Sequence, residues 1–65
     1  MRNYLFYIED SRYSVSTLLF VQSPSERHAR EFAAAKLAES TFYVSVTIWD
    51  GDREVAVVTT AGAGE

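Results

Sequence analysis

The segment Ser23-Pro24-Ser25-Glu26 most constrains the fold, because it predicts the start of a single helix near the middle of a 65-residue chain. Ser23 and Glu26 have the capping-box spacing, in which each side chain accepts a hydrogen bond from the other residue's backbone amide. Pro24 suits the first helical position, where its missing N–H costs nothing. We therefore predict a helix from Pro24 to about Glu39, with one half of the chain on either side of it.

The predicted helix is rich in alanine, which favours helix and allows close approach to a sheet. Glu26 and Arg30 are spaced for a stabilising ion pair on its surface. Lys36 is expected to extend its charge to solvent. The expected buried stripe consists of Ala29, Phe32, Ala33 and Leu37. Apolar residues also surround the helix axis, so an alternative is that a second chain covers part of the helix.

Two strands are predicted before the helix. Tyr4-Leu5-Phe6-Tyr7-Ile8 is a short apolar and aromatic run without alternation, which is typical of a central strand covered on both faces. A second strand is expected from Tyr13 to Val21, after a four-residue turn at residues 9–12. That turn would pair Ile8 with Tyr13, Phe6 with Val15 and Tyr4 with Thr17.

Two further strands are predicted after the helix. The first alternates, with Val44, Val46 and Ile48 on one face and Tyr43, Ser45, Thr47 and Trp49 on the other. Asp50-Gly51-Asp52-Arg53 provides a turn, and the last strand is expected from Glu54 to Thr60. A register pairing Ile48 with Val55 and Val46 with Val57 keeps the valine faces together.

The expected fold is therefore α+β, a ββαββ unit whose four-stranded antiparallel sheet carries one helix on one face. Strand order 2-1-3-4 makes every neighbouring pair antiparallel. Residues 1–60 form the predicted single domain, and 61–65 a flexible C-terminal tail. The core is expected to join Phe32 and Leu37 to Val44, Val46, Ile48, Val55 and Val57, with either Tyr4, Phe6 and Ile8 or Leu5 and Tyr7 from the first strand.

Size and composition indicate an oligomer. A chain of 7.3 kDa is expected to be marginally stable as a monomer, because so small a domain hides only part of its surface. Such chains usually gain stability from a disulfide, a metal or a partner, and this one has no cysteine and one histidine. We expect a homodimer, the commonest assembly. A net charge of −3 disfavours nucleic acid as a partner. No signal peptide or membrane-spanning run is recognised, so a cytoplasmic location without membrane contact is predicted.

The reactive side chains have ordinary structural explanations. Asp50 and Asp52 flank a glycine in a common hairpin turn, and they lack the further ligands of a calcium loop. Glu9 and Asp10 belong to the other hairpin, at the opposite end of the expected sheet. His28 is expected to be a solvated helix residue. We therefore predict no catalytic residues, no metal site, no cofactor and no enzymatic activity.

Three aromatic residues, Tyr7, Tyr43 and Trp49, are the candidate interface or ligand residues, because they are expected on the sheet face away from the helix. The preferred hypothesis is a small acidic interaction protein that dimerises and binds another protein. The alternative is a binder of a planar small molecule or single-stranded nucleic acid, with these rings as a stacking face. The lack of accompanying cations favours the first hypothesis.

The layout resembles that of small bacterial ββαββ proteins that open with a strand of the type Tyr-x-Phe-x-Ile-x-Asp, here Tyr4 to Asp10, and close with a Trp-Asp-Gly hairpin, here Trp49 to Gly51. The resemblance implies the fold. It implies no activity and transfers no catalytic residue.

Overall fold

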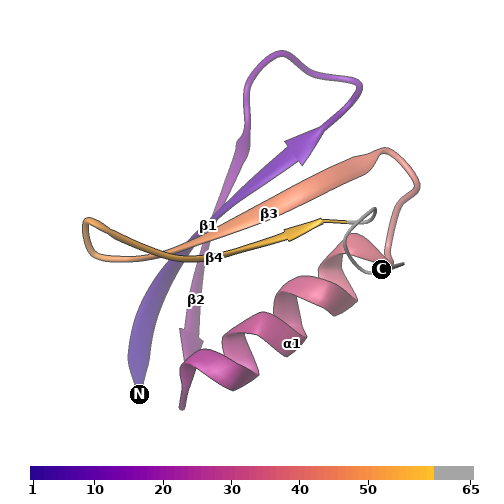
Figure 1. The fold of residues 1–65 in the computed structure, drawn as a ribbon. Helices are drawn as coiled ribbons and strands as arrows, with labels where there is room; N and C mark the ends of the chain where they lie inside the picture. The colour runs from indigo at the N-terminus through magenta and orange to yellow at the C-terminus, as the bar shows by residue number, and fades with distance from the viewer. Residues whose placement is uncertain (60–65) are drawn as a thin grey trace.

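Four strands and one helix form in the computed structural model, which describes residues 1–59 (Figure 1). The elements are β1 (Arg2–Asp10), β2 (Thr17–Ser23), α1 (Glu26–Leu37), β3 (Tyr43–Asp50) and β4 (Arg53–Thr59). The predicted end of the last strand at Thr60 and the predicted tail at 61–65 lie outside the described residues.

The sheet has the predicted order β2-β1-β3-β4, and each neighbouring pair is antiparallel. β2 and β3 consequently run parallel on either side of β1. Such a pair cannot be joined by a tight turn. The helix provides the crossover between them, which explains why the chain places one helix between two hairpins.

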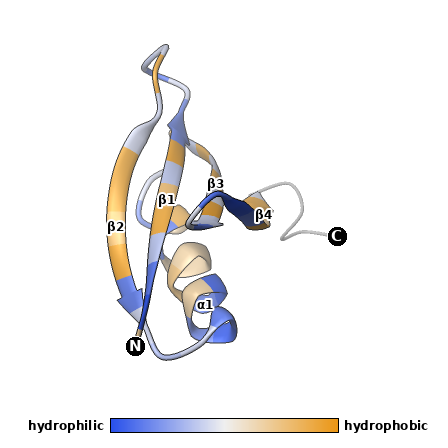
Figure 2. Ribbon diagram, turned by 90° about the vertical axis from the view of Figure 1, so that its left-hand side faces the viewer, coloured by the Kyte–Doolittle hydropathy of each residue, from blue (hydrophilic) through white to orange (hydrophobic). Residues whose placement is uncertain are grey.

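The helix covers one face of the sheet, and the other face is open (Figure 2). Phe6 is completely buried and meets the half-exposed Phe32 ring edge to face, with centroids 5.8 Å apart. In β1 the side chains that face the helix are Tyr4, Phe6 and Ile8, not the alternative set of Leu5 and Tyr7. The buried apolar residues are Tyr4, Phe6, Ile8, Val21, Ala29, Ala33, Leu37, Val46 and Ile48.

The helix begins two residues later than predicted, and the Ser23–Glu26 capping box is wrong. Ser25 is the N-cap, and its Oγ accepts a hydrogen bond from the backbone N–H of His28 at 3.2 Å. Ser23 is instead the last residue of β2, paired with Arg2, and its hydroxyl donates to the Ser25 carbonyl oxygen. Because the strand already uses Ser23, the cap passes to the next serine.

The first hairpin has a longer loop than predicted. Ile8 pairs with Thr17, four residues beyond the predicted partner Tyr13. Within the loop, Asp10 Oδ1 accepts a hydrogen bond from the Arg12 backbone N–H at 2.8 Å, and the loop continues to Ser16. Because the register of β2 moves by four residues, an even number, the same alternate residues of β2 still face the helix. Leu19, the observed partner of Phe6, therefore lies on the helix side.

The register predicted for the second hairpin is also wrong. Ile48 pairs with Ala56 rather than Val55, and Val46 with Val58 rather than Val57. The turn itself is as short as expected, with Gly51 at φ +67°. A β-bulge between Ile48 and Trp49 absorbs one residue of β4. Val57 is therefore half exposed on the open face, and Val58 packs against the core.

Candidate functional site on the open sheet face

The sheet face opposite α1, called here the open face, is covered by no element of residues 1–59. Cross-strand pairing aligns its apolar side chains, because Leu5 lies beside both Phe20 and Trp49, and Tyr7 beside Leu18. Phe20 is 81% exposed and Leu18 53% exposed. Soluble monomers seldom expose apolar side chains in such a continuous row.

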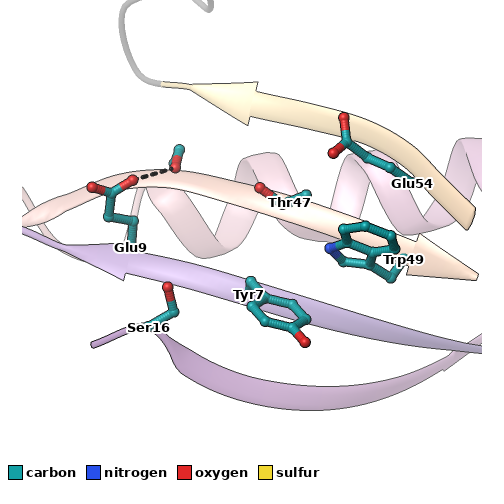
Figure 3. Close-up of a pocket in the computed structure, with 7 residues that line it drawn as sticks. Tyr7, Glu9, Ser16, Thr47, Trp49 and Glu54 are labelled. Atoms are coloured by element: carbon teal, nitrogen blue, oxygen red, sulfur yellow. Dashed lines mark hydrogen bonds between the residues drawn. The ribbon is translucent and has the colours of Figure 1, made fainter. Parts of the chain in front are cut away.

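A shallow hollow of about 310 Å³ lies on the open face over β1, β3 and β4 (Figure 3). Its lining combines two aromatic side chains, two carboxylates and three serine or threonine hydroxyl groups. The lining residues are Tyr7, Glu9, Ser16, Ser45, Thr47, Trp49 and Glu54. All but Ser16 come from strands, so most of the hollow is built on the rigid part of the fold.

Tyr7 and Trp49, two of the three candidate residues, form the aromatic part of the hollow. Their ring centroids are 6.2 Å apart, and the planes are inclined at 54°. They occupy diagonal positions on β1 and β3, because Trp49 pairs directly with Leu5. The two rings lie next to each other on neighbouring strands (Figure 3), and Tyr7 is 38% exposed.

Tyr43, the third candidate, does not join them. Glu9 pairs with Ser45 but Asp10 pairs with Tyr43, so a β-bulge leaves Val44 without a partner position. The bulge turns Tyr43 to the helix side, where it is half buried and packs against the core. The regular alternation assumed from the sequence therefore placed Tyr43 on the wrong face.

The hollow is negatively charged. Glu9 and Glu54 lie on opposite sides of it (Figure 3), and its seven lining residues include no lysine or arginine. The Ser45 hydroxyl donates a hydrogen bond of 3.3 Å to Glu9 Oε1, which orients that carboxylate. Elsewhere in the described chain, ion pairs join Arg2 and Arg53 to Asp50, Arg12 to Asp10, Arg27 to Glu31, Arg30 to Glu26 and Lys36 to Glu39.

A second charged cluster has a structural role at the end of β1. Both Asp10 carboxylate oxygens accept hydrogen bonds from the Arg12 side chain, at 3.0 and 2.7 Å. These bonds lower the pKa of the Asp10 carboxyl, against the burial that raises it, and the Arg12 backbone N–H lowers it further. Arg12 also lies over the rings of Tyr13 and Phe42. The cluster therefore fixes the β1–β2 loop against the α1–β3 connection.

Acid–base and metal chemistry find little support in this geometry. Asp10 and Asp50 lie at opposite ends of the sheet, as expected. Ser25 Oγ lies 2.9 Å from His28 Nδ1, but that hydroxyl already caps the exposed start of the helix, away from the hollow. Among residues 1–59, no three His, Cys, Asp or Glu side chains are grouped to hold a metal ion. In the same range, no helix is long and apolar enough to span a membrane.

Comparison with protein families, with curated proteins and with solved structures gave no significant match. Functional interpretation therefore depends on the geometry of the open face.

The sequence analysis did not identify Leu18 and Phe20, two main residues of the open face. Their alternation with the inward Leu19 and Val21 was concealed by four consecutive apolar residues. It also did not combine Glu9 and Glu54 with the aromatic pair, since they are far apart in sequence.

Proposed function

We propose that this chain is a non-enzymatic interaction protein that forms a homodimer and binds another protein through its open face. The observation that carries the proposal is the continuous apolar row on that face, with Phe20 81% exposed at its end. A cysteine-free chain also suits the reducing cytoplasm, which is the location we propose.

Self-association is proposed for the apolar half of the open face, defined as Leu5, Leu18 and Phe20 on β1 and β2. These side chains bear no charge, and stacking two copies over them would bury the apolar surface that a small one-sided sheet leaves in water. The hollow is centred on β1, β3 and β4, on the other side of Tyr7. A dimer formed by the apolar half therefore leaves the hollow accessible to a partner.

Light scattering on a size-exclusion column, over a range of protein concentrations, tests this dimer. We expect a mass twice the 7.3 kDa of one chain. Phe20→Thr should shift the protein toward monomer, since it removes a large exposed ring while keeping a residue that favours strand. Val15→Thr is the control, because Val15 is 74% exposed in the β1–β2 loop, outside the apolar half. A wild-type protein that stays monomeric at every concentration would contradict the dimer.

The second candidate function is binding of a planar small molecule against the Tyr7 and Trp49 rings, which lie beside each other in the hollow. Single-stranded nucleic acid is less compatible, because the two carboxylates of the hollow would repel a phosphate backbone. Titration of Trp49 fluorescence with nucleotides, flavins and oligonucleotides tests this alternative. An unchanged emission spectrum across the panel would remove it.

A further inference from the structure

We propose that the hollow receives a lysine or arginine side chain from an extended, basic and apolar segment of the partner protein. This inference rests on the proposed function and specifies the chemistry of the partner. Three features of the described residues support it: the charge of the hollow, its aromatic surface and its apolar rim.

The first feature is unbalanced negative charge. Glu9 and Glu54 line the hollow from two different strands, and none of the other lining residues carries a positive charge. Glu9 has one hydrogen bond of 3.3 Å, from a neutral serine hydroxyl. A cation placed over Trp49 would interact favourably with Glu54, which is paired with Trp49, and Glu9 adds to the negative charge at the other side of the hollow. An anionic or phosphorylated partner would be repelled by both.

The second feature is the aromatic surface. A lysine or arginine cation binds favourably over the face of tryptophan or tyrosine when it lies within about 6 Å of the ring centre. Trp49 provides the strongest such face, and Tyr7 lies at an angle beside it. A cation seated on Trp49 would also be close to its cross-strand neighbour Glu54.

The chain already contains an arginine held in this way. Arg12 binds the Asp10 carboxylate and lies 4.6 Å from the Phe42 ring centre and 5.3 Å from that of Tyr13. The hollow provides the same groups, two aromatic rings and carboxylates, but its lining contains no cation. The Arg12 cluster therefore illustrates the kind of contact that a partner's side chain would complete.

The third feature is the apolar rim of the hollow, formed by Val57. It favours a protein segment over a free small cation as the occupant. The hollow is shallow, and Val57, 51% exposed, lies beside Thr47 on the β4 side of it. A free cation would contact the rings and carboxylates alone. An extended segment in which a basic residue is flanked by apolar residues would contact Val57 as well, and so bury additional apolar surface.

A nuclear magnetic resonance titration of the full chain tests the proposal, with the Trp49 indole N–H signal as the readout. The probe is a short peptide carrying one arginine between two leucines. Its twin replaces arginine by citrulline, which has nearly the same shape without the charge. We expect the arginine peptide to bind about fivefold or more tightly, from the combined cation–π and ion-pair contributions, and to lose affinity with added salt.

Three variants locate the effect. Glu54→Gln should weaken the arginine peptide about two- to fivefold, because Glu54 is paired with Trp49. Glu9→Gln should weaken it less, because Glu9 is paired with Ser45, at the other side of the hollow. Both should leave the citrulline peptide unchanged. Glu31→Gln is the matched control, because Glu31 is an exposed glutamate on α1, away from the hollow, and the substitution changes the net charge equally. Circular dichroism confirms that each variant is folded. Equal weakening by all three would attribute the effect to net charge and overturn the site.

The remaining outcomes separate this inference from the proposed function. Equal affinity for the two peptides overturns the basic side-chain site and leaves a neutral peptide-binding face. Equally tight binding of N-acetylarginine amide, or binding of oligothymidylate at the Trp49 signal, also overturns it in favour of a small molecule or nucleic acid. If neither peptide binds but light scattering shows a dimer, the inference fails and the self-association stands. A monomer that prefers the arginine peptide supports the inference and refutes the dimer.

Discussion

At the scale of single residues, Asp10 is a buried carboxyl whose charge is held by the fold. It is buried, and its carboxylate receives two side-chain hydrogen bonds and one backbone hydrogen bond from Arg12. The pKa of Asp10 is lowered mainly by the Arg12 side-chain bonds. A carboxyl with a lower pKa when folded stabilises the protein fully above its unfolded pKa of about 4, and loses that contribution as pH falls through the folded pKa.

We therefore expect the free energy of unfolding to decrease below about pH 4. Asp10→Asn should lower the free energy of unfolding at neutral pH. It should also make that free energy change less as the pH falls below about 4. Urea unfolding measured between neutral pH and acid checks both effects. Asp52→Asn, in the exposed β3–β4 turn, is the control and should retain the wild-type pH dependence. Identical acid profiles for wild type and Asp10→Asn would refute this role.

At the scale of elements, the start of α1 depends on Ser25. Ser25→Ala should reduce stability by about 1 kcal/mol, since it removes the acceptor for the His28 backbone N–H. In a domain of this size that corresponds to a melting temperature about 4–8 °C lower. Ser25→Asp should recover most of the loss, because aspartate is also a good N-cap. Thermal unfolding followed by circular dichroism checks this, and failure of aspartate to recover stability would show that the serine acts in another way.

The bulge in the second hairpin makes an element-scale prediction of its own. Val58→Thr places a hydroxyl against the core and should cost about 1 kcal/mol, whereas Val57→Thr on the open face should cost little in the monomer. Without the bulge, Val57 would face the core and Val58 would lie on the open face. Unfolding of both variants at low protein concentration decides between the registers. A larger loss for Val57→Thr would restore the register predicted from the sequence.

These elements show which parts of the fold are readable from sequence. Alternation at Val46 and Ile48, the helix start near Pro24 and the antiparallel pairing rule were sufficient for the strand order and part of the core. Three residues expected in the core are instead exposed: Phe32, Val44 and Val57. The bulges were not predictable, because each changes alternation by one residue without a glycine or proline at the site. The cap was misassigned because Ser23 and Ser25 are both suitable residues. Only the pairing of Ser23 with Arg2 distinguishes them.

At the scale of the whole molecule, the same reasoning predicted only part of the candidate site. Trp49 was placed on the face away from the helix by the alternation of its strand, whereas the face of Tyr7 was left open because the first strand shows no alternation. Tyr43 was misplaced because a bulge intervenes. Glu9 and Glu54 come from separate hairpins, and they line one hollow because β1, β3 and β4 are neighbours in the registers observed. Which side chains line the hollow depends on the strand registers, and the pattern of apolar and polar residues within each strand does not determine those registers.

The exposure of Phe20 finally predicts how the stability of the whole protein depends on its concentration. If two copies associate only when folded, mass action stabilises them by about 0.7 kcal/mol per subunit for each tenfold increase, or about 3–6 °C in melting temperature. Phe20→Thr should abolish this dependence and melt close to dilute wild type, because an 81% exposed side chain contributes little to the monomer. Val15→Thr should retain it. Wild-type melting that is independent of concentration would mean that the apolar half stays exposed to water, and that a different molecule covers the open face.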